Sequence, residues 1–338
     1  MSETETIIEA EGLQTYFEQK RSIKEILMRE DTQSVQAVDG VSVELSRNEV
    51  IGVIGESGCG KTTLLMTLLG LQDSTGGTLT FNGKSYAEFD RSDWKEFRRN
   101  VQIIFQDPFD SLDPQMTVRE TLEIPLDVHD IGNKEERILD TLERVELRPP
   151  ERYIDRYPQQ LSGGEKQRVS IARALILDPE VILADEPVSM LDVSTQAVIL
   201  QLLSDLAEQE EIAMMYISHD LSTVSYVCDR INVMYLGRFI ETAPTAELLN
   251  NPKHPYSQEL IKAIPVANPH RERDRTVLEG STPEPIDMGE GCRFADRCPE
   301  VMDVCEHTPR AVAVSEDDLD GEHEAACHLY YDHQEGDR

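Results

Sequence analysis

The stretch EVIGVIGESGCGKTT, at residues 49–63, decides the fold of this chain. Its first seven residues predict a buried parallel strand ending in a glycine-rich turn, and a helix is expected over 61–71. The spacing G-x-x-x-x-G-K-[ST] is matched by Gly55, Gly60, Lys61 and Thr62. The motif is specific when it joins a strand to a helix, as here, which leaves little room for a chance glycine-rich turn. The stretch therefore predicts a phosphate-binding loop in an α/β domain.

The residue types of this loop suit a nucleoside triphosphate with its magnesium ion. Glycines let backbone N–H groups close around phosphate oxygens, and the start of the next helix adds positive potential. Lys61 is expected to reach the β- and γ-phosphates, and Thr62 to place its hydroxyl on Mg²⁺. The nucleotide contacts expected of the loop come from Gly55, Glu56, Ser57, Gly58, Cys59, Gly60, Lys61, Thr62 and Thr63.

A second apolar strand, VILADEP at 181–187, ends in two carboxylates. Asp185 at its tip is placed to hold Mg²⁺, directly or through water, and Glu186 to polarise the attacking water. Alone, this pattern fits a capped strand end equally well. With a phosphate loop upstream, a catalytic reading is the better interpretation.

Further motifs resemble those of the ABC ATPases. LSGGEKQR at 161–168 resembles the family's signature, with Glu165 in place of the usual Gln. IIFQDP at 103–108 resembles the Q-loop, SMLD at 189–192 the D-loop, and YISHD at 216–220 the switch region. With the two motifs above, they follow the family's order over residues 1 to about 250. Val188 and Met190 depart from the family's usual Thr and Ala without replacing a catalytic group.

This resemblance implies roles for individual residues. Gln106 would sense the γ-phosphate, contribute to the Mg²⁺ site and link to a helical subdomain, and His219 would bond the γ-phosphate and position the water. Phe17 stands where the family stacks an aromatic ring on adenine, with Tyr16 as the fallback. The ATP held by the opposite subunit of a dimer would be contacted by Ser162, Gly163 and Gly164. Hydrolysis is thus expected from Glu186, His219, Gln106 and Lys61.

Three other stretches resemble the oligopeptide/dipeptide importers within that family. They are IIFQDPFDSLDPQMTVRETLEIPL at 103–126, NNPKHPYSQELIKAIP at 250–265 and GCRFADRCPEVMDVC at 291–305. The resemblance implies two membrane permeases, a second ATPase subunit in a homo- or heterodimer, an extracytoplasmic solute-binding protein and a place at the cytoplasmic face of the membrane. The solute itself is not readable here, because it would contact the binding protein and permeases. The alternative is a soluble ABC ATPase of translation or DNA repair.

Four of the six cysteines, Cys292, Cys298, Cys305 and Cys327, are spaced C-x5-C-x6-C-x21-C near the end of the chain. Four thiolates suit either Zn²⁺ or a [4Fe–4S] cluster. The alternative is four buried or disulfide-paired cysteines. The resemblance to the importers favours the iron–sulfur cluster, with His328 as a spare ligand.

The amino-acid composition limits the kinds of partner that this chain is expected to bind. The chain has 338 residues and 65 acidic against 32 basic ones, a net charge of −33. No basic excess is available to neutralise nucleic-acid phosphates, so nucleic acid is not an expected partner. Abundant acid with scarce Lys favours a salt-rich cytoplasm, where screening removes the self-repulsion. No apolar run is long enough to span a membrane and the acidic N-terminus lacks a signal peptide, so a soluble, intracellular protein is expected.

The expected organisation is α/β, with one nucleotide-binding unit. Residues 1–265 are expected to form the ABC ATPase nucleotide-binding domain, a mixed sheet core plus a helical subdomain at about 92–176. Residues 266–338 are expected to form a small Cys-rich C-terminal extension of the oligopeptide-importer type, stapled by the metal cluster.

Overall fold

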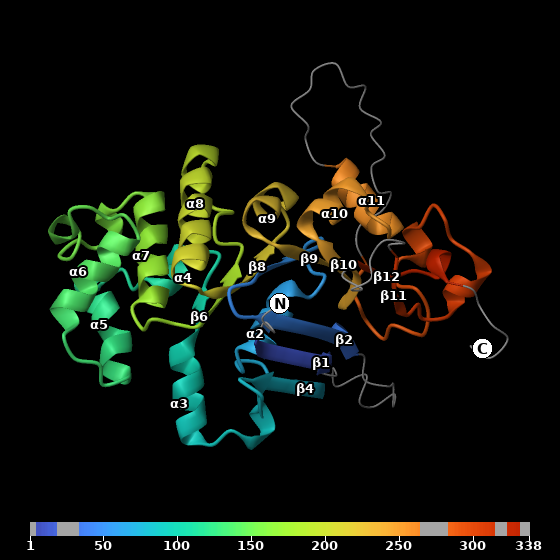
Figure 1. The fold of residues 1–338 in the computed structure, drawn as a ribbon, viewed down its shortest axis with the longest axis horizontal. Helices are drawn as coiled ribbons and strands as arrows, with labels where there is room; N and C mark the ends of the chain where they lie inside the picture. Colours follow the sequence, from blue (N-terminus) through green and yellow to red (C-terminus); the bar gives the residue numbers. More distant parts are fainter. Residues whose placement is uncertain (1–4, 19–33, 264–282, 315–322, 332–338) are drawn as a thin grey trace, which may run out of the picture. The chain divides into compact units, whose positions relative to one another are not determined.

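The computed structural model describes residues 5–18, 34–263, 283–314 and 323–331. The chain divides into two compact units, each assembled from separate stretches of sequence. Unit 1 consists of Met1–Glu9, Glu44–Ile51 and Thr80–Ser218, and unit 2 of Ala10–Val43, Gly52–Leu79 and His219–Arg338. Figure 1 labels the strands and helices of both.

Unit 1 contains three neighbouring parallel strands, in the order β6-β7-β8. They are β6 (Val101–Ile104), β7 (Val181–Asp185) and β8 (Ala213–Ser218). Every residue of β7 and β8 is buried, which explains why both read as continuous apolar runs without alternation. In register, Asp185 of β7 lies opposite Ile217 of β8, so both carboxylates that follow Ala184 lie at the carboxyl end of β7.

Helices dominate the rest of unit 1. Three of them, α5, α6 and α7, pack on one another in the segment between β6 and β7 (Figure 1). Their contact faces bury apolar residues such as Leu122, Ile138 and Leu142. The helices of unit 1 are α3 (Arg91–Asn100), α4 (Pro108–Ser111), α5 (Val118–Val128), α6 (Lys134–Arg144), α7 (Gly163–Leu175) and α8 (Val193–Gln209), and the short strand β5 is Lys84–Ser85.

Unit 2 contains most of the residues of two sets of strands. The first has the order β2-β1-β4, from β1 (Thr6–Glu18), β2 (Ser34–Ser46) and β4 (Gly76–Phe81). The second has the order β11-β12-β10-β9-β3, from β3 (Val50–Ile54), β9 (Arg230–Tyr235), β10 (Arg238–Pro244), β11 (Ala311–Ala313) and β12 (Glu324–Ala326). Its helices are α2 (Lys61–Leu68), α9 (Leu221–Val227), α10 (Thr245–Asn250) and α11 (Pro255–Lys262).

A tight hairpin joins β9 to β10. Its two loop residues, Leu236 and Gly237, have φ of 45° and 84°. Positive φ at both positions is the geometry of a type I′ turn, which matches the twist of antiparallel strands. A side chain at Gly237 would meet the Gln36 carbonyl at 2.6 Å, so the close approach of β2 also requires glycine there.

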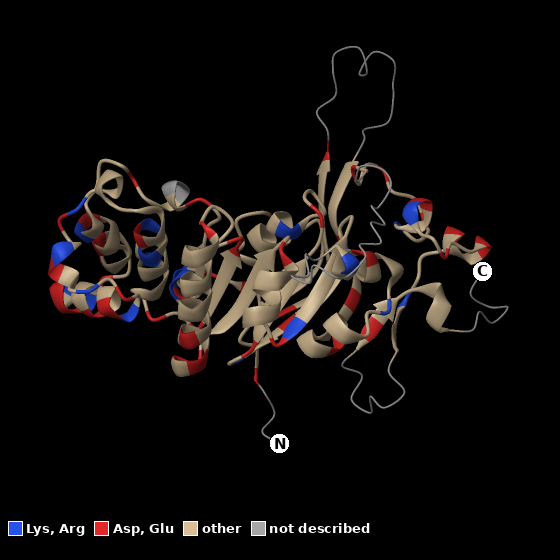
Figure 2. Ribbon diagram, turned by 90° about the horizontal axis from the view of Figure 1, so that it is seen from above, with Lys and Arg blue, Asp and Glu red and all other residues tan. Residues whose placement is uncertain are grey.

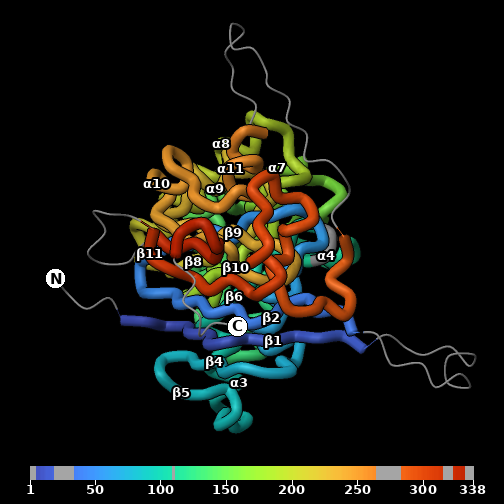
Figure 3. Tube along the Cα trace, turned by 90° about the vertical axis from the view of Figure 1, so that its right-hand side faces the viewer, coloured from blue at the N-terminus to red at the C-terminus, as the bar shows by residue number. Residues whose placement is uncertain are grey.

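The C-terminal segment extends this second set of strands. Strand β12 pairs antiparallel with β10, and β11 pairs antiparallel with β12. Figure 3 labels β9, β10 and β11 of this set. Val35 of β2 forms a bridge with Ile286, and the Gln36 N–H donates to the Pro285 carbonyl at 2.8 Å. The extension is therefore tied to unit 2 by backbone hydrogen bonds at both ends of its described part.

The α/β fold with parallel and antiparallel strands agrees with the sequence prediction. The buried strand expected over residues 49–55 is β3, and the chain turns just before it at Asn48, whose φ is 59°. The predicted boundary at 265 lies outside the described residues. In the described part of the chain, every helix falls short of the length and apolar character that crossing a membrane requires.

Candidate functional site

The phosphate loop of unit 2 connects β3 to α2 and wraps around the Lys61 side chain. The Lys61 Nζ donates to the carbonyl of Gly55 at 2.8 Å and to that of Glu56 at 3.0 Å. The side chain is buried, so its charge is focused inside the loop. Lys61, which is expected to bind phosphate, and the loop around it therefore lie together at the start of a helix, a preorganised geometry that suits an anion.

Backbone crowding explains a glycine of this loop. Gly60 caps α2 with φ of 110°, and a Cβ there would lie 2.0 Å from the Ala37 carbonyl oxygen. A side chain at this position would displace the strand that packs against the loop. Thr62, the expected Mg²⁺ ligand, is exposed in the first turn of α2, whereas Cys59 is fully buried and burial raises the pKa of its thiol.

The two candidate adenine-stacking rings differ in what they contact. Tyr16 donates a short hydrogen bond to Asp39, and burial together with that bond raises the pKa of Tyr16 to about 12. Phe17, next along β1, is 39% exposed. The Phe17 ring is thus accessible for stacking while Tyr16 is engaged within the protein, which favours Phe17 for this role.

In unit 1, the structure brings Gln106 and Glu186 together. The Gln106 Nε2 donates to Glu186 Oε2 at 3.0 Å. Glu186 follows β7 with φ of 45°, and its N–H donates to the Ile217 carbonyl at 2.9 Å. Asp185, the last residue of β7, is buried. Two residues predicted from separate motifs are therefore in direct contact, with the expected Mg²⁺ ligand one position away.

The signature motif forms the start of α7. The Ser162 Oγ accepts from the N–H of Glu165 at 3.3 Å, and the Glu165 carboxylate accepts from the N–H of Ser162 at 2.7 Å. Burial of the Glu165 carboxylate favours its protonated form and so raises its pKa. The hydrogen bonds that it accepts from Ser162 act in the opposite direction, and the net result is a lowered pKa of Glu165. Glu165 in place of the family's usual Gln thus completes a capping box, and it keeps Ser162, Gly163 and Gly164 at a helix N-terminus.

The segment after β7 contains the two residues, Val188 and Met190, that differ from those usual in the ABC ATPases. Val188 is 3% exposed and packs as a core residue, whereas Met190 is 64% exposed. Asp192 caps α8, accepting from the Thr195 N–H at 3.1 Å. The valine at this position therefore fills interior space. His219 follows directly after buried β8 and is exposed.

The four C-terminal cysteines lie near enough to influence one another. Burial raises the pKa of Cys292 to about 11, with added contributions from Cys305, Cys327 and Cys298. Burial also raises the pKa of Cys298 and Cys327. Nevertheless, within the described ranges no three or more His, Cys, Asp or Glu side chains are arranged to hold a metal ion. The four thiols are still donors of the type that iron–sulfur clusters and zinc take.

The ring of His328, expected as an additional metal ligand, contacts other protein groups. Its Nε2 lies 2.8 Å from the His307 carbonyl, and its Nδ1 lies 2.8 Å from the Tyr331 hydroxyl. Both ring nitrogens are therefore engaged by protein groups, and the expectation of His328 as an additional metal ligand does not match this geometry.

Two arginines outside the predicted site residues contact the phosphate loop and β2 within unit 2. Arg297 pairs with Glu56 of the phosphate loop, and Arg293 pairs with Asp39 of β2. Both belong to GCRFADRC at 291–298, where the signals visible in the sequence are the family resemblance and the two cysteines.

Comparison with known proteins gives the family. A family model described as ABC transporter matches residues 38–189, and one described as the C-terminal region of oligopeptide/dipeptide transporters matches residues 240–305. The oligopeptide transport ATP-binding protein AppF of Bacillus subtilis is 40% identical over 96% of this chain and 98% of its own length. The dipeptide transport ATP-binding protein DppF of Haemophilus influenzae is 40% identical over 90% of this chain and 92% of its own length.

A solved structure shares the fold. The dimeric ATP-binding cassette MJ0796, in a post-hydrolysis state with ADP and Pi, superposes with a TM-score of 0.61 at 27% identity. That match covers 71% of this chain and 99% of the cassette. Because the sequence relatives match nearly end to end and the cassette fold is shared, this chain belongs to the ABC transporter family, among the ATPases that carry the oligopeptide/dipeptide transporter C-terminal region.

Proposed function

We propose that this chain binds and hydrolyses MgATP to power an ABC importer for oligopeptides or dipeptides. The observation that carries the ATPase part is the phosphate loop closed around buried Lys61. The import part is supported by the near full-length relatives that are named for oligopeptide and dipeptide transport.

In this proposal, each residue of the candidate site has a defined task. Lys61 and the loop N–H groups bind the β- and γ-phosphates, while Thr62, Asp185 and Gln106 serve the magnesium ion. Glu186 polarises the water for in-line attack, and His219 holds the γ-phosphate and the water in place. The contact between Gln106 and Glu186 supports this assignment, because Gln106 fixes the orientation of the Glu186 carboxylate.

The signature serine and glycines would serve ATP that is held by a second subunit. Ser162 caps a helix whose N-terminus attracts anions, which supports this role. The partners we propose are a second ATPase subunit, two membrane permeases and, through them, an extracytoplasmic binding protein. The chain would then act as a peripheral subunit at the cytoplasmic face of the membrane.

The partner proposal is tested by gentle purification of the tagged chain from solubilised membranes in high salt. Two multi-span permeases and a sibling ATPase, identified by mass, are the expected result. Ribosomal or DNA-repair proteins without any membrane protein would overturn the importer proposal and leave the ATPase chemistry standing.

We further propose that Cys292, Cys298, Cys305 and Cys327 hold a [4Fe–4S] cluster, with Zn²⁺ as the alternative. The support is the presence of four cysteine thiols in the C-terminal part of the chain, three of them inside the matched C-terminal region. Anaerobically purified protein should contain about four iron and four sulfide per chain. Zinc in place of iron and sulfide would support the alternative. Protein that contains neither iron nor zinc would refute the site.

The strong acidity supports one more proposal about surroundings. With a net charge of −33, the chain is suited to a cytoplasm rich in salt, where counter-ions screen the repulsion between its carboxylates.

A further inference from the structure

The phosphate loop contains a carboxylate that is held by the C-terminal extension. Glu56 is the second residue of the loop, and its two carboxylate oxygens accept from the Nη1 and Nη2 of Arg297 at 2.9 and 3.1 Å. The side chain of Arg297 is 9% exposed and that of Glu56 is 23% exposed. A bidentate pair with this little solvent is geometrically defined, unlike a surface ion pair.

The backbone of the same residue is held from another direction. The N–H of Glu56 donates to the Tyr256 hydroxyl of α11 at 3.0 Å. The Tyr256 ring packs on Tyr235 at 4.7 Å and on Phe294 at 5.4 Å between centroids, and Arg297 also donates to the Tyr235 hydroxyl at 3.2 Å. A cluster of three aromatic rings therefore holds both Glu56 and its arginine partner in place.

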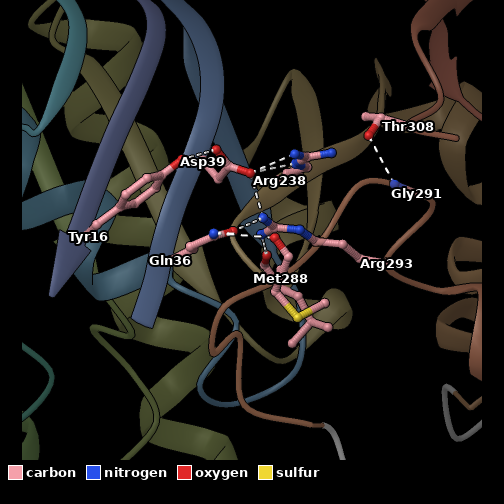
Figure 4. A network of polar contacts seen from close by, with 9 residues as sticks. Tyr16, Gln36, Asp39, Arg238, Met288, Gly291, Arg293 and Thr308 are labelled. Carbon is pink, nitrogen blue, oxygen red and sulfur yellow. Dashed lines mark hydrogen bonds and ion pairs between the residues drawn. The ribbon is translucent and has the colours of Figure 1, made fainter. Parts of the chain in front are cut away.

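The extension also contacts β2, the neighbour of the strand β1 that carries Phe17 (Figure 4). Arg293 donates to the carboxylate of Asp39 and, at 2.6 Å, to Gln36 Oε1. Asp39 in turn accepts from Arg238 and from Tyr16, which precedes Phe17. Two arginines four residues apart, on the segment that carries Cys292 and Cys298, thus contact the loop and β2 in unit 2.

The position of Glu56 makes its partner important for anion binding. A carboxylate on a loop that receives a polyphosphate repels the ligand unless a cation neutralises it. Removing one partner of a partly buried pair leaves the other charge uncompensated, and this costs more than the pair itself contributes. The phosphate loop would therefore be electrostatically compromised without Arg297.

We propose that Arg297 is a positioning residue for the nucleotide, which neutralises Glu56 and fixes its side chain away from the bound polyphosphate. Through Arg297, the cysteine-bearing segment 291–305 sets the affinity of the phosphate loop for ATP. The inference rests on the proposed role of this loop in ATP binding, and it identifies the C-terminal extension as part of the nucleotide site.

The test compares full-length variants by titration with a fluorescent ATP analogue and by steady-state ATPase kinetics. The variants are Arg297→Ala, Arg297→Lys, Glu56→Gln and the Glu56→Gln/Arg297→Ala double variant. Arg310→Ala is the matched control, because Arg310 lies on the same extension and stacks on Tyr331 at 4.9 Å, away from the loop. Thermal unfolding without nucleotide reports whether each variant is folded.

Arg297→Ala is expected to weaken nucleotide binding roughly tenfold and to raise KM with a smaller change in kcat. Arg297→Lys, which keeps the charge but loses the bidentate geometry, should lie between Arg297→Ala and the native protein. The double variant should bind better than Arg297→Ala alone, because it removes the uncompensated carboxylate. A merely structural role for Arg297 does not produce this recovery.

The inference is overturned if Arg297→Ala binds nucleotide within twofold of the native protein and of Arg310→Ala. It is also overturned if the double variant binds no better than Arg297→Ala. Lys61→Ala separates this from a failure of the proposed function: if nucleotide binding survives that substitution, the loop is not the ATP site at all. Loss of binding in Lys61→Ala with normal binding in Arg297→Ala would refute the arginine's role alone.

Discussion

Glu186, to which we assign the activation of water, has a strained backbone conformation. Its φ of 45° places a non-glycine residue in the left-handed region, where the backbone costs on the order of 1 kcal/mol. Hydrogen bonds from its N–H to Ile217 and from Gln106 to its carboxylate hold that conformation. The left-handed conformation ends the extended backbone of β7 directly at Glu186, the residue to which we assign the activation of water.

At the same scale, Lys61→Ala should weaken ATP binding by about 10- to 100-fold, since charge-assisted hydrogen bonds contribute roughly 1.5–3 kcal/mol each. The measurement is equilibrium titration with a fluorescent ATP analogue. Lys95→Ala is the control, because Lys95 is a half-exposed lysine paired with Asp130 on the surface. Unchanged affinity in Lys61→Ala would remove the loop from the nucleotide site.

The strands and helices that carry the motifs were predictable, because their local sequence patterns match the burial and the helix start that the structure shows. The apolar runs of β7 and β8 indicated buried strands, and the pattern Ser-x-x-Glu at Ser162 and Glu165 is a capping box visible in sequence. Here the sequence predicts both the element and the residue that starts it.

Elements of the C-terminal part were not predictable in the same way. Strands β11 and β12 have three residues each, too short for a periodic signal. The pairing of Arg297 with Glu56 joins residues 241 positions apart, and nothing in either local sequence specifies the partner. Such contacts are determined by how the extension packs on the rest of unit 2.

The start of helix α11 gives a prediction about pH. His254 caps this helix by accepting from the Tyr256 N–H at 3.1 Å, and burial lowers the pKa of His254 from 6.5 to about 4. Between these values the unfolded chain binds a proton that the folded chain does not, so stability should fall as the pH falls. The loss from this group is up to about 3 kcal/mol by pH 4.

Urea unfolding at several pH values between 7 and 4 measures this effect against His254→Asn. Asparagine keeps a capping acceptor but has no proton to bind, so the variant should lose less stability over this range than the native protein. Equal slopes for the two proteins would contradict the assignment of this pH dependence to His254.

At the scale of the whole molecule, the distribution of charge is the dominant feature. Figure 2 shows acidic positions on most of the described helices, with fewer basic positions among them. The net charge of −33 creates repulsion that opposes the compact state in dilute salt. Exposed ion pairs such as Lys95–Asp130 offset little of it, because such pairs contribute at most about 1 kcal/mol.

The thermal midpoint should therefore rise as KCl is increased from 0.05 to 2 M, where the screening length falls from about 14 Å to a few ångströms. Differential scanning fluorimetry measures it, with an uncharged osmolyte at matched osmolality as the control. A midpoint that is constant or falls with KCl, while the osmolyte raises it, would contradict the proposed adaptation to salt.

The central claim is ATP hydrolysis with Glu186 as the residue that activates water, and single-turnover hydrolysis by Glu186→Gln tests it most directly. Glutamine keeps the size of the side chain and the contact with Gln106 but loses the carboxylate that polarises water. The account predicts ATP affinity within about threefold of the native protein, hydrolysis slowed by a factor of about 100 or more, and accumulation of an ATP-bound dimer. Hydrolysis at a near-native rate would contradict it.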